Sequence, residues 1–224
     1  MKKLKGILVS SLVLISVVSF AQLPKTMPQT PAVPTAMPTT SAVAMPTANA
    51  TKEPVVTTDS TAIMLDKAVS ANASGDKMAT VAALKTSTVS LEKTANASKS
   101  DFKDKLMGQV GNLKKLIPLA ESGLLGGGVL QKAAGLAKMA IGANQISSLL
   151  GGGSLLGSAS ALTGGLGLLK SGLPSLGGVS ASTGGSLISS AMSAVGSLGS
   201  GGAAAEPAAK SALGGVLNFA KGVL

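Results

Sequence analysis

The chain has 224 residues, of which 29 are glycine, and it contains no histidine, cysteine, arginine, tryptophan or tyrosine. That composition removes the usual general base, the side chains that most often bind zinc, and the guanidinium that holds anions through paired hydrogen bonds, so we expect a non-enzymatic protein without metal or cofactor. The formal charge of +10 favours an anionic partner, but the missing arginine and stacking aromatics argue against nucleic acid.

Residues 1–21 have the pattern of a secretory signal peptide. A lysine-rich start is followed by an apolar run over residues 6–20 and by small side chains at Ser19 and Ala21, the order that a signal peptidase reads. We therefore expect cleavage between Ala21 and Gln22 and export to an extracellular, periplasmic or outer-envelope location. The alternative is an uncleaved anchor, but the strongly apolar part is shorter than the roughly 20 residues that a spanning helix needs.

Residues 22–58 form a linker rich in proline and threonine. Met-Pro pairs recur at 27/28, 37/38 and 45/46, and proline both fixes φ and removes a backbone hydrogen-bond donor. Such a segment cannot complete the hydrogen bonding of a helix or sheet, so we expect it to be disordered and extended. It is either a stalk that reaches away from a membrane or cell wall, or a leader without that role.

Residues 59–118 are predicted to form a short amphipathic helical bundle or hairpin. Ser74-Gly75 and residues 98–100 interrupt the helical pattern. The helices are expected at about 60–73, 76–97 and 101–117. The second carries a stripe at Met78, Val81, Leu84, Thr88, Leu91 and Ala95, and the third at Phe102, Leu106, Val110, Leu113 and Ile117. One narrow apolar stripe on each helix is typical of helices that pack side by side.

The ends of the third helix carry the charges that a helix dipole favours. Asp101 and Asp104 lie in its expected first turn, and Lys114 and Lys115 lie in its expected last turn. Pro118 should then stop or kink the helix, because a proline ring cannot donate the next backbone hydrogen bond.

The spacing Ser-x-x-Lys, which penicillin-binding enzymes use for their nucleophile, begins at Ser74, Ser90 and Ser100. The Ser-Asp-Asn and Lys-Thr-Gly partner motifs of those enzymes do not follow. We therefore interpret the three copies as exposed polar helix surface and expect no catalytic residue.

Residues 119–224 form a low-complexity region rich in glycine, leucine and alanine. From Gly123 onward, Glu206 is the only acidic residue. We expect helices punctuated by glycine clusters, with Pro207 in the first turn of the last one. Their approximate positions are 129–149, 154–170, 186–199 and 206–221. One face of the third of these helices, with Leu187, Ile188, Met192 and Val195, should either pack on neighbouring helices or enter a membrane.

Two windows without charge, 139–169 and 171–205, raise the question of membrane contact. Small residues recur at every fourth position from Gly153 to Gly165 and from Gly177 to Ala205. This spacing resembles the glycine zippers of some membrane and pore-forming proteins. Glycine-rich helices that pack on one another without lipid are the favoured alternative, because interior glycine weakens a helix and triple-glycine runs more readily end one.

The lysine-rich start, the cleavage before Gln22 and the tripeptide Asp59-Ser60-Thr61 resemble exported proteins of the Bacteroidota group. The resemblance implies O-glycosylation of Ser60, because the signal of that group is Asp, then Ser or Thr, then an aliphatic residue or Thr. The alternative is that Asp59 or Ser60 caps the first helix.

The sequence thus predicts a mainly α-helical, exported or envelope-associated protein with a structural or interaction role. An anionic envelope surface or a second copy of the chain would be its partner. The second hypothesis is a membrane-active protein whose glycine-rich C-terminal helices insert into, or assemble on, membranes.

Overall fold

The computed structural model describes residues 58–224, with side chains from Ser60 onward. The expected signal peptide, the linker and the cleavage site between Ala21 and Gln22 lie outside these residues. The α-helices are α1 (Thr58–Ala73), α2 (Lys77–Ala97), α3 (Lys103–Ser122), α4 (Gly127–Gly151), α5 (Ala159–Gly172), α6 (Gly178–Gly201) and α7 (Glu206–Val223), with short 3-10 helices η1 (Leu173–Ser175) and η2 (Gly202–Ala205). No strand occurs between residues 58 and 224, so the mainly α-helical fold class is confirmed.

Local chemistry explains where the first helices end. Gly75 and Gly123 follow α1 and α3 with φ of 76° and 74°, a left-handed conformation that glycine adopts at little cost. Asp76 caps α2, because its carboxylate accepts a hydrogen bond of 2.9 Å from the Ala79 backbone N–H. The observed bounds of α1, α2, α4 and α7 agree closely with the expected ones.

Of the stop or kink expected at Pro118, the stop is wrong. Pro118 lies inside α3, which continues to Ser122. Leu116 and Ala120 on either side of the proline are buried, and their packing holds the helix together where one backbone hydrogen bond is missing. The longer helix also corrects the placement of Lys114 and Lys115, which lie before its last turn.

Two C-terminal helices begin at other places than expected. The start of α5 is delayed to Ala159 because the preceding loop is held by the buried Leu155. By contrast, α6 begins early, at Gly178, and continues through Gly184. A Cβ at Gly184 would lie 2.5 Å from Leu173 Cδ2, so this glycine provides close packing rather than a helix end.

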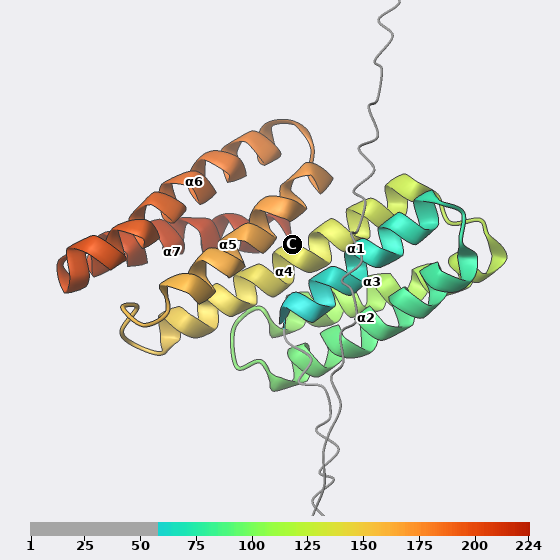
Figure 1. Cartoon of the computed structure of the whole chain (residues 1–224), viewed down its shortest axis with the longest axis horizontal. Helices are drawn as coiled ribbons and strands as arrows, with labels where there is room; N and C mark the ends of the chain where they lie inside the picture. Colours follow the sequence, from blue (N-terminus) through green and yellow to red (C-terminus); the bar gives the residue numbers. More distant parts are fainter. Residues whose placement is uncertain (1–57) are drawn as a thin grey trace, which may run out of the picture. The chain divides into compact units, whose positions relative to one another are not determined.

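Two apolar cores lie on either side of α4, which contributes to both (Figure 1). The first core, between α1, α2, α3 and α4, includes Leu65, Leu84, Leu91, Leu106, Leu113 and Leu130. The second core, between α4, α5, α6 and α7, includes Phe102, Met139, Ile146, Leu162, Leu166, Ile188 and Leu213. The predicted short bundle is thus present and gains α4 as a further helix.

Glycine brings α4 and α5 into direct backbone contact. A Cβ added at Gly142 would lie 2.5 Å from the carbonyl oxygen of Gly165, and one at Gly172 would collide with the carbonyl oxygen of Gly135. These glycines are seven residues apart on each helix, whereas the expected zipper had a period of four. Gly153 and Gly157 of that expected pattern have nothing within 4 Å of an added Cβ, so only the Gly165 position of its first run contributes here.

Candidate functional site

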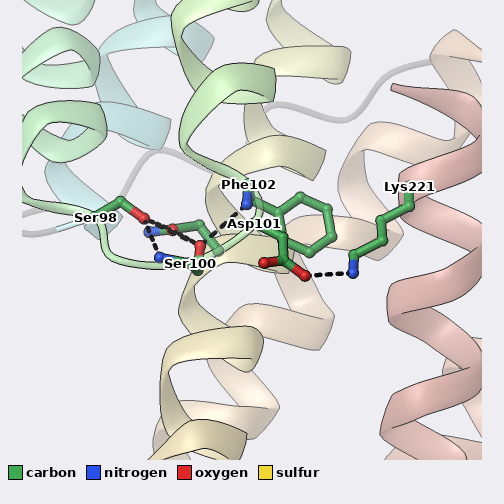
Figure 2. Close-up of polar contacts among 6 residues, drawn as sticks. Ser98, Ser100, Asp101, Phe102 and Lys221 are labelled. Atoms are coloured by element: carbon green, nitrogen blue, oxygen red, sulfur yellow. Dashed lines mark hydrogen bonds and ion pairs between the residues drawn. The ribbon is translucent and has the colours of Figure 1, made fainter.

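The most connected polar cluster lies in the loop between α2 and α3 (Figure 2). The amide oxygen of the buried Asn144 in α4 accepts hydrogen bonds from the hydroxyls of Ser98, at 2.5 Å, and Ser100, at 2.6 Å. The Ser100 hydroxyl oxygen in turn accepts a hydrogen bond of 3.2 Å from the Phe102 backbone N–H. These bonds fix the loop on α4 and use up the hydroxyls, which is a structural arrangement.

An ion pair beside this cluster connects the same loop to α7. Lys221 Nζ lies 2.7 Å from Asp101 Oδ2 and 5.8 Å from the centre of the Phe102 ring. The hydrogen bond from Lys221, and then its charge, hold the pKa of Asp101 below its ordinary value. Asp101 was expected in the first turn of α3 but precedes the helix. Asp104 does lie in the first turn, as expected. The pair supports the position of Phe102, whose ring is fully buried in the second core.

The Ser-x-x-Lys spacings do not assemble a nucleophile. The Ser74 hydroxyl donates to the Ser70 carbonyl oxygen at 2.7 Å, and the Ser100 hydroxyl donates to Asn144. Ser90 is only 5% exposed, which corrects its interpretation as surface. Among residues 58–224 there is also no group of acidic side chains that could hold a metal ion.

Glu206, the lone acid after Glu121, joins two segments. Its Oε1 atom accepts hydrogen bonds from Lys210 Nζ at 3.0 Å and from the Leu155 backbone N–H at 3.1 Å. The bond from Lys210 and then that from Leu155 hold the pKa of Glu206 below its ordinary value. The carboxylate therefore fastens the loop between α4 and α5 to the start of α7.

The predicted packing or membrane face of α6 contributes to the second core. Ile188 and Val195 are each 1% exposed, while Leu187 and Met192 are partly buried against the same core. In this structure the four side chains lie together as a packing face. No helix between residues 58 and 224 combines the length and the apolar character needed to cross a membrane.

Ser60, the predicted O-glycosylation residue, is half-buried in the first turn of α1. It lies within the helix and not ahead of it. Its glycosylation stays a prediction, as does the export on which that modification depends.

Large apolar side chains are exposed together at one end of the first core. The turn between α1 and α2 and the loop between α3 and α4 meet there (Figure 1), and an added Cβ at Gly127 would lie 3.6 Å from Asn72 Nδ2. The exposed fractions are 86% for Met78, 78% for Leu124, 54% for Val129 and 41% for Leu119. We call these four residues, with the neighbouring Lys77 and Lys132, the tip.

An open groove of about 390 Å³ lies at the tip. Its lining consists of Lys77, Met78, Val81, Ala82, Lys85 and Glu121. The sequence pattern placed Met78 in the core stripe of α2, and the structure corrects this. Met78 lies in the first turn of α2, at the end of the bundle, where the neighbouring helices no longer cover it. That terminal position was the one signal in the sequence for an exposed side chain.

The charges at the tip leave two lysines without a partner. Asp76 caps α2, and Glu121 forms an ion pair of 2.9 Å with Lys85. Lys77 and Lys132 make no ion pair within residues 58–224. The tip therefore combines an exposed apolar surface with a small excess of positive charge, because Asp76 and Glu121 offset two of the three lysines at 77, 85 and 132.

No protein-family model, curated protein or solved structure matches this chain.

Proposed function

We propose that this chain is an exported, non-enzymatic protein of the cell envelope or cell surface that acts by binding through its tip. The observation that carries this proposal is the gathering of Met78, Leu119, Leu124 and Val129 in exposed positions at one end of the bundle. Four large apolar side chains exposed in adjoining turns exceed the singly scattered ones that are normal on a protein surface, and such apolar surface marks interaction sites. The leader pattern of residues 1–21 supports export.

The polar groups support a binding role over a catalytic one. Ser98, Ser100 and Asn144 are occupied with one another, and Glu206 is occupied with Leu155 and Lys210. A catalytic nucleophile needs a nearby base and an open position for the reacting atom. Insertion by α6 is not proposed, because Ile188 and Val195 already pack inside the second core.

Cell fractionation tests the proposal with two matched variants. Met78→Ser combined with Leu124→Ser removes the apolar character of the tip, whereas Val89→Ser combined with Val179→Ser changes exposed valines elsewhere, which are 67% and 82% exposed. We expect both variants to be exported and folded by circular dichroism, and only the tip variant to be lost from the envelope fraction. Equal retention of the two variants would contradict binding through the tip.

Export is tested separately by the N-terminal mass of the protein recovered outside the cytoplasm. We expect the chain to begin at Gln22. An intact Met1 terminus in the membrane fraction would favour an uncleaved anchor instead.

A further inference from the structure

The proposed function leaves the partner of the tip open. We infer that this partner is the surface of an anionic lipid bilayer, an inference that rests on the proposed binding through the tip. Met78 and Leu124 would enter the boundary between headgroups and acyl chains, while Lys77 and Lys132 would contact lipid phosphates. The tip is the end of a helical bundle, so it can touch a flat surface without any change in the packing of the two cores.

The apolar side chains of the tip suit a shallow insertion. Met78 and Leu124 are the most exposed of the four, at 86% and 78%, and they come from separate segments, the start of α2 and the loop after α3. Val129 in the first turn of α4 and Leu119 in the last turn of α3 are 54% and 41% exposed. Interfacial binding grows with the apolar area that leaves water and with attraction to anionic lipid.

The charges of the tip are complementary to anionic headgroups. The Asp76 carboxylate accepts a hydrogen bond from the Ala79 backbone N–H, which does not cancel its charge, and Glu121 is paired with Lys85. The three lysines at 77, 85 and 132 therefore outnumber the two acids by one. Lys77, which lies beside Gly123 at the end of α3, and Lys132 are exposed and can act on an external surface. Lysines near an anionic membrane contribute about 1 kcal/mol each, which for two lysines corresponds to about a thirty-fold change in partition.

A second copy of the chain is a poorer fit for the same surface. A stable protein interface uses about 20–30 residues on each side, whereas the tip and its groove contain only a few. A symmetric contact between two tips would also bring Lys77 and Lys132 of each copy toward those of the other, and like charges repel at that range.

The absence of cysteine from the chain permits a site-specific test. Leu124→Cys places a single thiol at the tip, and Val179→Cys places one at an exposed valine of α6, 82% exposed. Each full-length variant is labelled with an environment-sensitive fluorophore and mixed with vesicles of phosphatidylcholine, with or without one quarter phosphatidylglycerol. The fluorophore reports only on its own surroundings, so binding by another part of the chain does not imitate insertion of the tip.

We expect a blue shift and brighter emission at position 124 with the anionic vesicles only, and no change at position 179. Lipids that carry a quencher near the headgroup should quench the fluorophore at position 124 more than lipids that carry it at the bilayer centre. Lys77→Gln with Lys132→Gln should lower partition about thirty-fold. The matched control, Lys93→Gln with Lys103→Gln, changes exposed lysines at the other end of the bundle and should lower it far less.

Three results would overturn the inference. They are an unchanged spectrum at position 124, an equal change at position 179, and a change without vesicles that grows with protein concentration, which would identify a second copy as the partner. If anionic vesicles do not change the fluorescence at position 124, but the variant with Met78→Ser and Leu124→Ser is still lost from the envelope fraction, the tip binds a partner other than lipid. If that variant is retained as well, the proposed function itself is wrong.

Discussion

The two cores hold their helices together in different ways. The first core uses large leucines and is bordered by ion pairs between helices: Lys85 with Glu121, Lys114 with Glu92, and Lys138 with Asp66. The second core has no ion pair between α4 and α5, and there the glycines at 135, 142, 165 and 172 let the backbones touch. Close approach of two helices increases the number of weak dispersion contacts between them. The second core can therefore pack well although its sequence is poor in charged residues and aromatic rings.

The largest expected effect comes from Phe102, the only aromatic ring that is fully buried among residues 60–224. Although it precedes α3, it packs in the second core. Phe102→Ala should lower the free energy of unfolding by about 3–5 kcal/mol. Hydrogen exchange measured by mass spectrometry should show the greatest loss of protection in α5, α6 and α7.

Leu84→Ala is the matched change in the first core, because Leu84 is also fully buried. It should cost about 2–5 kcal/mol and should raise exchange chiefly in α1, α2 and α3. If both variants raise exchange equally along the whole chain, the two cores unfold as one unit and the comparison between them loses its energetic meaning.

The glycine contact between α4 and α5 gives the next effect. A Cβ at Gly142 would lie 2.5 Å from the Gly165 carbonyl oxygen, so Gly142→Ala must push the helices apart. We expect a loss of about 1–3 kcal/mol in denaturant unfolding.

Gly164→Ala provides the control on the same helix pair. Gly164 lies within α5 and has nothing within 4 Å of an added Cβ, so alanine should stabilise the protein by up to about 1 kcal/mol through its better helix propensity. If Gly142→Ala stabilises the protein as Gly164→Ala does, the backbone contact between α4 and α5 does not hold the second core together.

Local signals in the sequence sufficed to predict the fold class and several helix ends. Gly75 could be recognised as a helix end because its role depends on its own conformation, whereas the end of α3 at Gly123 was missed in favour of Pro118. The apolar face of α6 could be recognised from its period, and Ile188 and Val195 on that face are each 1% exposed. Such features need no knowledge of how distant segments pair.

Features that depend on the register of distant helices were missed. The contact of Gly142 with Gly165 needs the alignment of α4 on α5, and the place of Phe102 needs α7 beside the start of α3. The exposed Met78 follows the same periodic pattern as its buried neighbours. The tip could not be predicted because the end of a helix relative to its neighbours is set by tertiary packing.

Acid should weaken the second half through Glu206. Because its folded pKa is lowered by Lys210 and Leu155, the carboxylate stabilises the fold above its unfolded pKa, and this contribution is lost as pH falls through the lower folded pKa. The thermal midpoint should therefore decrease as the pH is lowered below the ordinary pKa of a glutamate, about 4.3. The drop should be smaller in Glu206→Gln, and also in Lys210→Met, which removes the main cause of the lowered pKa. An unchanged acid profile in both variants would exclude Glu206 as a fastening group.

The smallest effect concerns the ion pair between Lys114 and Glu92 beside the first core. Lys114 and Glu92 lie 2.9 Å apart with side chains 53% and 37% exposed, so water screens their attraction. Glu92→Gln should cost about 0.2–1 kcal/mol, and 1 M salt should abolish this difference because the screening length there is about 3 Å. Lys138 is the contrasting case, since its side chain is 10% exposed and pairs with Asp66.

Asp66→Asn removes the charged partner of Lys138; because the Asp66 side chain itself is 64% exposed, the cost should stay near the lower end of the range for a hydrogen bond to a charged group, about 1.5 kcal/mol, and high salt should remove part of it. Urea unfolding of both variants at low and high salt makes the comparison. If Glu92→Gln costs as much as Asp66→Asn, the surface pairs contribute more than exposure predicts, and the first core depends on its charged border as well as on its leucines.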